Sequence, residues 1–221
     1  MLLPHGFKFI RSSNASMAVL LVSKLDYTSS RQQRMAVLLV SDSNFFYRSS
    51  DGRSVFDLVG DSTTDVAYYG IWERKLCKVD RNLEDMFRFI RSLGVHDAMV
   101  ILCLGQHDVF DAKHVRLARA VSKIVLLVEK YQHKLVVVEL FDHSDFSASK
   151  EGYAAGVSTL NLLWKHEALT DVAIEVLSTS FIGDHHFIPD LMHLNSEGMA
   201  ILASVLQTKI NAFCLPKRCL S

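Results

Sequence analysis

The sequence of 221 residues has no excess of either charge. Lysine and arginine together number 24, and aspartate and glutamate also number 24, so the formal net charge is zero. Proteins that bind nucleic acid over a broad surface usually carry a clear basic excess, so this class is disfavoured. A disordered chain is excluded as well, because 49% of the residues are hydrophobic, which is enough to form a core.

Long hydrophobic runs and metal-binding cysteine spacings are also missing. The longest apolar runs have about six or seven residues, far fewer than the roughly 20 that a membrane-spanning helix needs. The run Met17–Val22 is too short for a typical signal peptide. The four cysteines, Cys77, Cys103, Cys214 and Cys219, contain no C-x-x-C pair. We expect a soluble, cytoplasmic protein with reduced thiols, although a bridge between Cys214 and Cys219 stays open.

Only three prolines, at positions 4, 189 and 216, interrupt the chain, so long elements can form between its ends. Short apolar segments typical of buried parallel strands are Met35–Val40, Ala98–Leu104, Leu135–Leu140 and Val172–Leu177. Helical patterns alternate with them at Asn82–Leu93, Ala112–Lys130, Tyr153–Leu169 and Asn195–Phe213. This alternation predicts an α/β fold, a three-layer α/β/α sandwich with a mostly parallel central sheet.

A short repeat precedes the predicted domain. The segment Met17–Ser23 reads MAVLLVS and recurs as Met35–Ser41. Two copies do not make a solenoid, which needs at least three, so we interpret the first copy as a local duplication. We therefore expect an N-terminal extension over residues 1–30, one domain over residues 31–214 and a tail over residues 215–221.

Three polar clusters stand where an α/β sheet would bring them together. Ser41-Asp42-Ser43-Asn44 follows the first predicted strand, and Gly105-Gln106-His107-Asp108 follows the strand Ala98–Leu104. Asp190-x-x-His193-Leu194-Asn195-x-x-Gly198 leads into the last predicted helix. Because parallel strands gather their carboxyl ends at one edge of a sheet, we expect all three clusters to line one crevice.

The order of these clusters resembles that of the SGNH (GDSL-type) hydrolases, whose blocks read GDS, GxND and DxxH. The resemblance covers roughly residues 35–213 and implies an SGNH-hydrolase or flavodoxin-like fold. It also implies a serine esterase that cleaves a small acyl ester, with a small-molecule ester as substrate and no cofactor or metal. By resemblance, Ser43 is the nucleophile, His193 the general base and Asp190 the carboxylate that orients it.

The chemistry of these three side chains agrees with the resemblance. A serine hydroxyl is a poor nucleophile until a neighbouring imidazole accepts its proton. Asp190 lies three residues before His193, close enough on a turn to accept a hydrogen bond from Nδ1–H. That contact would fix the tautomer and leave Nε2 facing Ser43, as general-base catalysis requires.

Two positions depart from the family pattern. Ser41 replaces the glycine of GDS, and His107 replaces the asparagine that donates to the oxyanion in the family. By resemblance, the other oxyanion donors are the backbone N–H groups of Ser43 and of a glycine, for which Gly70 is the candidate. His107 is equally well interpreted as a histidine satisfied at a strand end.

These departures favour a second interpretation, a catalytically impaired SGNH-like domain that binds RNA or protein. Removal of one oxyanion donor typically lowers turnover by a factor on the order of 10²–10³. Some SGNH-like domains bind RNA, and a local basic patch in this chain would draw on Arg31, Arg34, Lys217 and Arg218.

Ser62 competes with Ser43 as the nucleophile, because Gly60-Asp61-Ser62 spells the family's GDS. We prefer Ser43 since its strand is longer, whereas Val55–Val59 before Ser62 is interrupted by a charge. The interval from Ser43 to Asp108 also leaves room for a helix, a second strand and another helix. Taken alone, Ser43 would be interpreted as a turn serine that caps a helix.

Two further groups of residues have competing interpretations. A metal site is disfavoured for Asp184, His185 and His186 with Asp190 and His193, because adjacent histidines rarely bind one ion. The aromatic residues Phe45, Phe46 and Tyr47 after the serine either shape an apolar acyl pocket or pack in the core.

Overall fold

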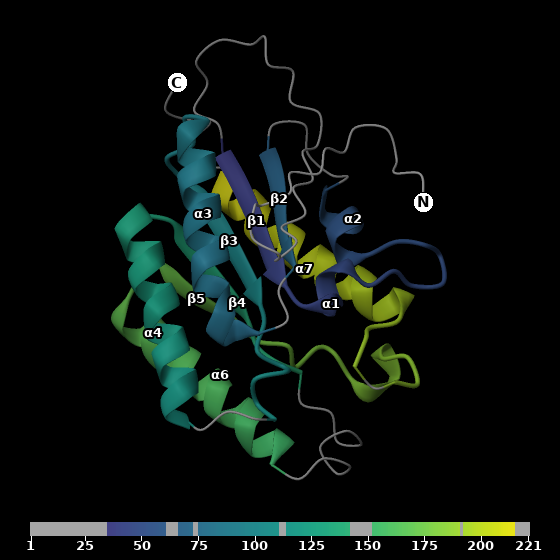
Figure 1. Ribbon diagram of the computed structural model, residues 1–221. Coiled ribbons are helices and arrows are strands. Elements are labelled where there is room, and N and C mark those ends of the chain that lie inside the picture. The colour runs from purple at the N-terminus through teal and green to yellow at the C-terminus, as the bar shows by residue number, and fades with distance from the viewer. Residues whose placement is uncertain are drawn as a thin grey trace.

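Five parallel strands form the sheet at the centre of the molecule, in the order β2-β1-β3-β4-β5 (Figure 1). The structure is a computed structural model, and it describes residues 35–60, 66–72, 75–110, 114–141, 152–190 and 192–214. The strands are β1 Met35–Ser41, β2 Val66–Trp72, β3 Ala98–Cys103, β4 Lys134–Val138 and β5 Ile174–Leu177. Each neighbouring pair is parallel, as the sequence predicts.

Helices cover both faces of this sheet (Figure 1). One face carries α3 Val79–Ser92, α4 His114–Tyr131 and α6 Tyr153–Thr170, and the other carries α1 Ser43–Phe46, α2 Val55–Gly60 and α7 Ser196–Cys214. Because successive side chains of a strand point to opposite faces, Leu38 and Leu39 of β1 join different hydrophobic clusters. The predicted three-layer α/β/α sandwich is confirmed.

Burial on both faces of the sheet explains why its central strands stand out as apolar runs in the sequence. All seven residues of β1 are buried, because helices cover the strand on both faces. A strand in this position has no polar face and therefore appears in the sequence as a continuous apolar run. Cys103, at the end of β3, is buried, and Cys77 and Cys103 carry free thiols. Cys219, and with it the possible bridge to Cys214, lies outside the described residues.

The segment Val55–Gly60 is a helix, α2, and not a strand of the kind that the alternative nucleophile Ser62 would need before it. Ser54 caps this helix, since its hydroxyl accepts a hydrogen bond from the backbone N–H of Asp57 (3.2 Å). The Asp57 carboxylate in turn accepts from the backbone N–H of Ser54 (3.0 Å). This reciprocal capping favours a helix over a strand despite the apolar residues. Asp61 and Ser62 lie outside the described residues.

Helix α3 begins three residues earlier than predicted and follows a 3-10 turn, Leu76–Lys78. The carboxylate of Asp108 accepts hydrogen bonds from the backbone N–H groups of Leu76 (2.7 Å) and Cys77 (3.3 Å). The cap thus comes from a distant part of the chain, where local sequence patterns cannot reveal it.

The described helices include none with the length and apolar character that crossing a membrane would require. The predicted extension over residues 1–30 and the predicted tail over residues 215–221 lie outside the described residues.

Candidate active site

His193 and Asp190 form a close pair in the segment before α7. Nδ1 of His193 lies 2.5 Å from Oδ2 of Asp190. The other carboxylate oxygen, Oδ1, accepts hydrogen bonds from the backbone N–H groups of Met192 (2.8 Å) and His193 (3.0 Å). With Nδ1 engaged, Nε2 is the ring nitrogen that remains to exchange a proton with another group.

The surroundings keep Asp190 ionised. Partial burial by itself would raise the pKa of this carboxyl, but the hydrogen bonds from the His193 ring and from two backbone N–H groups outweigh that effect. These hydrogen bonds hold the pKa of Asp190 below its usual range. An ionised Asp190 fixes the tautomer of His193 with the proton on Nδ1.

Tyr47 brings the segment after β1 against this pair. Its ring stacks on the imidazole of His193, with centroids 4.3 Å apart and planes inclined by 20°. Tyr47 directly follows α1, whose first residue is Ser43. The structure therefore joins the two predicted clusters that contain Ser43 and the His193–Asp190 pair. For Ser43 it describes the backbone only.

Asn195 and Gly198 fix the segment that carries His193 to the start of α7. The side-chain oxygen of Asn195 accepts from the backbone N–H of Gly198 (2.9 Å), and its amide donates to the carbonyl of His185 (2.8 Å). Asn195 therefore caps α7. A Cβ at Gly198 would lie 2.7 Å from the carbonyl oxygen of His186, so only glycine allows this close approach.

Ser41 fits the position where the family has glycine. Its side chain is fully buried, and its hydroxyl accepts a hydrogen bond from the backbone N–H of Phe45 (3.4 Å). Among the described non-glycine residues, only Gln132 has a positive φ, so Ser41 adopts an ordinary backbone conformation. A serine here caps α1 without backbone strain.

Besides Ser43, the residues predicted for the oxyanion hole are associated with the two strands beside β1. His107 follows β3 and is half-buried, in a turn that requires glycine at Gly105, where φ is 129°. Gly70 lies within β2, in register with Leu39 and two residues before the strand ends. The roles of Gly70 and His107 stay predictions.

No group of three histidine, cysteine, aspartate or glutamate side chains in the described ranges is arranged to hold a metal ion. His186, one residue of the metal site considered above, is buried and accepts a hydrogen bond on Nδ1 from the backbone N–H of Gly183 (2.9 Å). This bond gives the imidazole a structural role in the loop before α7.

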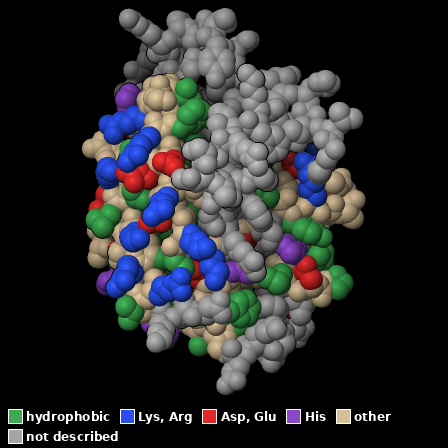
Figure 2. Space-filling view, viewed as in Figure 1, with side chains coloured by type: hydrophobic (Ala, Val, Ile, Leu, Met, Phe, Trp, Pro, Cys, Tyr) green, Lys and Arg blue, Asp and Glu red, His purple; other side chains and the backbone are tan. Residues whose placement is uncertain are grey.

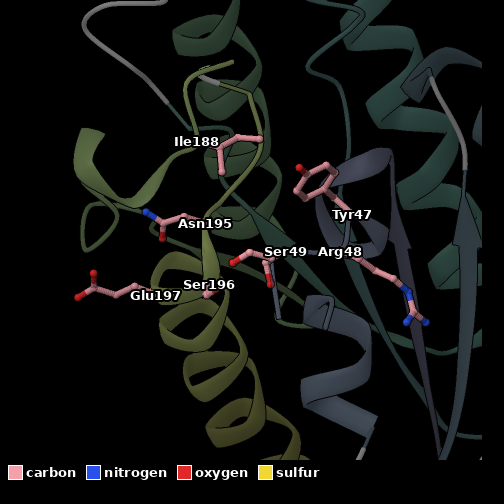
Figure 3. Close-up of a pocket in the computed structure, with 8 residues that line it drawn as sticks. Tyr47, Arg48, Ser49, Ile188, Asn195, Ser196 and Glu197 are labelled. Carbon is pink, nitrogen blue, oxygen red and sulfur yellow. The ribbon is translucent and has the colours of Figure 1, made fainter. Parts of the chain in front are cut away.

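A cavity of about 430 Å³ is lined in part by Tyr47, whose ring stacks on His193 (Figure 3). Its walls come from the segment after α1, from the loop before α7 and from the start of α7, and they consist of Tyr47, Arg48, Ser49, Ser50, Ile188, Asn195, Ser196 and Glu197. Of the three aromatic residues after Ser43, Phe45 is buried in the core, whereas Tyr47 lines this cavity. The sequence does not predict that Ser196 and Glu197 line a cavity, because serine and glutamate are common at helix starts and form no distinguishing pattern there.

Three solved structures share the architecture of this chain. A lipolytic protein of the G-D-S-L family from Veillonella parvula is 17% identical, with a TM-score of 0.60 over 79% of this chain and 98% of its own. The psychrotrophic esterase EstA from a Pseudoalteromonas species is 10% identical, with a TM-score of 0.59 over 81% and 98%. A carbohydrate esterase of family 3 from Talaromyces cellulolyticus is 13% identical, with a TM-score of 0.55 over 85% and 100%.

The chain has an SGNH-hydrolase-like fold. No protein-family model matches the sequence, and the curated proteins searched contain no match. At 10–17% identity the likeness is one of fold. The sequence resemblance points to two places in this fold as the candidate active site. One is the carboxyl end of β1, which Ser43 follows, and the other is the segment before α7.

Proposed function

We propose that the protein is a serine ester hydrolase in which Ser43 forms an acyl-enzyme. The contact between His193 and Asp190 at 2.5 Å carries this proposal, because it is the arrangement that prepares an imidazole to act as a general base. The stacking of Tyr47 on His193 supports it, since it brings the imidazole beside the segment that begins with Ser43.

The proposed reaction proceeds in two steps. Nε2 of His193 accepts the proton of Ser43 as the serine oxygen attacks the acyl carbon, and the alcohol then leaves with that proton. Water attacks the acyl-enzyme next, with His193 again as the base; the bond between the acyl carbon and the Ser43 oxygen breaks, the imidazolium returns its proton to that oxygen, and the carboxylic acid is released. Asp190 stays ionised throughout and stabilises the imidazolium that forms in each step.

The proposed oxyanion donors are the backbone N–H groups of Ser43 and Gly70 and the imidazole of His107. An imidazole N–H projects from a different position than an asparagine amide. We therefore expect slower turnover than an asparagine would support, by a factor on the order of 10²–10³ if His107 does not donate at all.

Serine labelling tests the proposal. The wild-type protein is expected to hydrolyse p-nitrophenyl acetate and to react with a fluorophosphonate probe at Ser43. Ser43→Ala should abolish both activities, whereas Ser62→Ala, the matched control, should retain both. His193→Ala should lose labelling while circular dichroism shows an intact fold. No hydrolysis and no labelling of the wild-type protein, or labelling lost only in Ser62→Ala, would refute the proposal.

A second candidate function is RNA binding, and one surface favours it. Figure 2 shows lysine and arginine side chains gathered over the face formed by α3 and α4. The exposed basic residues of these helices and of the turn before α3 are Lys78, Arg81, Arg88, Arg91, Arg116, Arg119, Lys123 and Lys130. We call this surface the basic face.

Acidic residues balance the basic face only in part. Asp80 pairs with Lys123 (2.9 Å), and Glu84 pairs with Arg88 (2.9 Å) and Lys130 (2.8 Å). The remaining cations fit the phosphate groups of a nucleic acid backbone. Fluorescence anisotropy with labelled single-stranded RNA tests this candidate: affinity should fall steeply with salt, and no binding at low ionic strength would exclude it.

A further inference from the structure

The cavity beside His193 has no role yet, and its position relative to the imidazole indicates one. We propose that it binds the alcohol part of the ester and that Glu197 makes it select neutral or cationic alcohols over anionic ones. This inference rests on the proposed serine ester hydrolysis and names the class of substrate for the same site.

The cavity adjoins the imidazole through residues that contact both. In serine hydrolysis the imidazolium returns its proton to the leaving oxygen, so the alcohol must lie next to that ring. Tyr47 contacts the His193 ring and also lines the cavity. Ile188, a second lining residue, donates its backbone N–H to the carbonyl of His193 (3.0 Å). The cavity and the proposed base therefore share their supporting residues.

Two polar lining residues are already committed to the fold. Asn195 uses its side-chain oxygen and its amide to hold α7 and the loop at His185. The hydroxyl of Ser49 donates within its own turn, to the carboxylate of Asp51 and towards the carbonyl of Arg53. The other uncharged lining residues are Tyr47, Ser50, Ile188 and Ser196, so the cavity offers a ligand three hydroxyl-bearing side chains and one apolar one, a lining suited to an uncharged group.

Charge distinguishes the two ends of the cavity. Arg48 donates to the carbonyl of Gly52 (3.0 Å) and lies 3.6 Å from the carboxylate of Asp57, so its charge is compensated within the protein. Figure 3 shows Arg48 and Glu197 at opposite ends of the labelled lining residues, each with its charged group directed outward. Glu197 is exposed, and its carboxylate adds negative charge to this end of the cavity. An anionic alcohol would be repelled there, and a cationic one attracted.

Three aryl acetates that differ in one substituent test this selectivity. Their leaving groups are 4-hydroxybenzoate, 4-hydroxybenzamide and 4-hydroxyphenyl-trimethylammonium, which are anionic, neutral and cationic. The kcat/KM of each charged ester is divided by that of the neutral ester, so that differences in chemical reactivity cancel between variants. Glu197→Gln should lower the cation-to-anion ratio by about tenfold at low ionic strength, and less in high salt.

Glu129→Gln is the matched control, because Glu129 is an exposed carboxylate on α4, on the other face of the sheet. It makes the same change in net charge and should leave the ratio as in the wild type. An unchanged ratio in Glu197→Gln, or an equal change in Glu129→Gln, would overturn the assignment of the cavity while ester hydrolysis persists. If none of the three esters is hydrolysed and Ser43 is not labelled, the proposed function itself fails, and the cavity assignment with it.

Discussion

His133 is a histidine buried without a hydrogen-bonding partner. It is only 3% exposed, and neither ring nitrogen has a hydrogen-bond partner in the described part of the chain. The ring packs edge-on against Phe87, with centroids 4.6 Å apart. Burial lowers its pKa to about 4, against a usual value of 6.5, and Arg91 adds to this, while Asp97 opposes it. The folded protein therefore holds His133 neutral at neutral pH.

This burial predicts a loss of stability in mild acid. The unfolded chain protonates His133 below about pH 6.5, whereas the folded chain does so only near pH 4, so the free energy of unfolding falls as pH falls between these values. The expected contribution is roughly 3 kcal/mol in full and ~2–3 kcal/mol between pH 7.5 and 4.5. Urea unfolding at pH 7.5 and pH 4.5 measures this contribution. Between these two pH values, the free energy of unfolding of His133→Leu should fall less than that of the wild type, and the difference should equal the contribution.

The control for this experiment is His96→Leu, at an exposed histidine after α3. It should show the same acid sensitivity as the wild type. Equal losses of stability in the wild type and His133→Leu would contradict the prediction.

At the scale of elements, the start of α7 determines where His193 lies. Asn195 caps the helix through Gly198 and also binds the carbonyl of His185, so one side chain joins the helix to the loop on its N-terminal side. An isolated antiparallel β-bridge between Phe187 and Leu194 also closes this loop. The imidazole therefore depends on the helix end for its position.

Asn195→Ala is expected to lower both stability and ester hydrolysis. Loss of the cap should cost about 1 kcal/mol in the free energy of unfolding. Loss of the hydrogen bond to the His185 carbonyl should release the segment from Asp190 to His193. We therefore expect kcat to fall by a larger factor than the factor by which KM rises. Asn195→Asp keeps the capping oxygen but not the amide donor, so it should recover stability without full activity. Urea unfolding and steady-state kinetics measure the two effects.

Asn211→Ala serves for comparison, because Asn211 lies on the same helix with its side chain exposed, where it accepts a hydrogen bond from the Gln207 amide (3.0 Å). We expect near wild-type stability and activity from this variant. Full activity in Asn195→Ala would show that the cap does not position His193.

At the scale of the whole molecule, the two candidate functions use different faces of the sheet. The basic face lies on α3 and α4, whereas the cavity and the His193–Asp190 pair lie beside α1 and α7. Formal neutrality conceals this separation, since opposite charges elsewhere in the chain cancel those of the basic face.

This separation predicts independent effects of mutation. The double variant Arg81→Glu and Arg119→Glu should weaken any RNA binding about tenfold or more and reduce its salt dependence, while ester hydrolysis stays at the wild-type rate. Ser43→Ala should abolish ester hydrolysis and leave any RNA binding unchanged. Anisotropy titrations and p-nitrophenyl acetate assays on both variants measure these effects. Joint loss of both activities in either variant, with the fold intact, would show that the two faces are not independent.

Local patterns in the sequence predict much of this fold. The buried strands appear as apolar runs, and helices such as α4 and α6 appear within two residues of their bounds. The pairing of Asp190 with His193 is also predictable, because three residues of separation on a turn bring both side chains together. By contrast, the apolar residues of Val55–Val59 do not by themselves distinguish a strand from a helix, and the reciprocal cap between Ser54 and Asp57 belongs to a helix.

The sequence by itself determined the parallel sheet and the order of the polar clusters, because both follow from periodicity and from neighbours along the chain. Only the tertiary structure decided that Tyr47 covers His193, that Asp108 caps a helix turn and that a cavity opens between the segment after α1 and the start of α7. These contacts join residues far apart in the chain. Their free energy depends on packing in three dimensions, which leaves no periodic mark in the sequence.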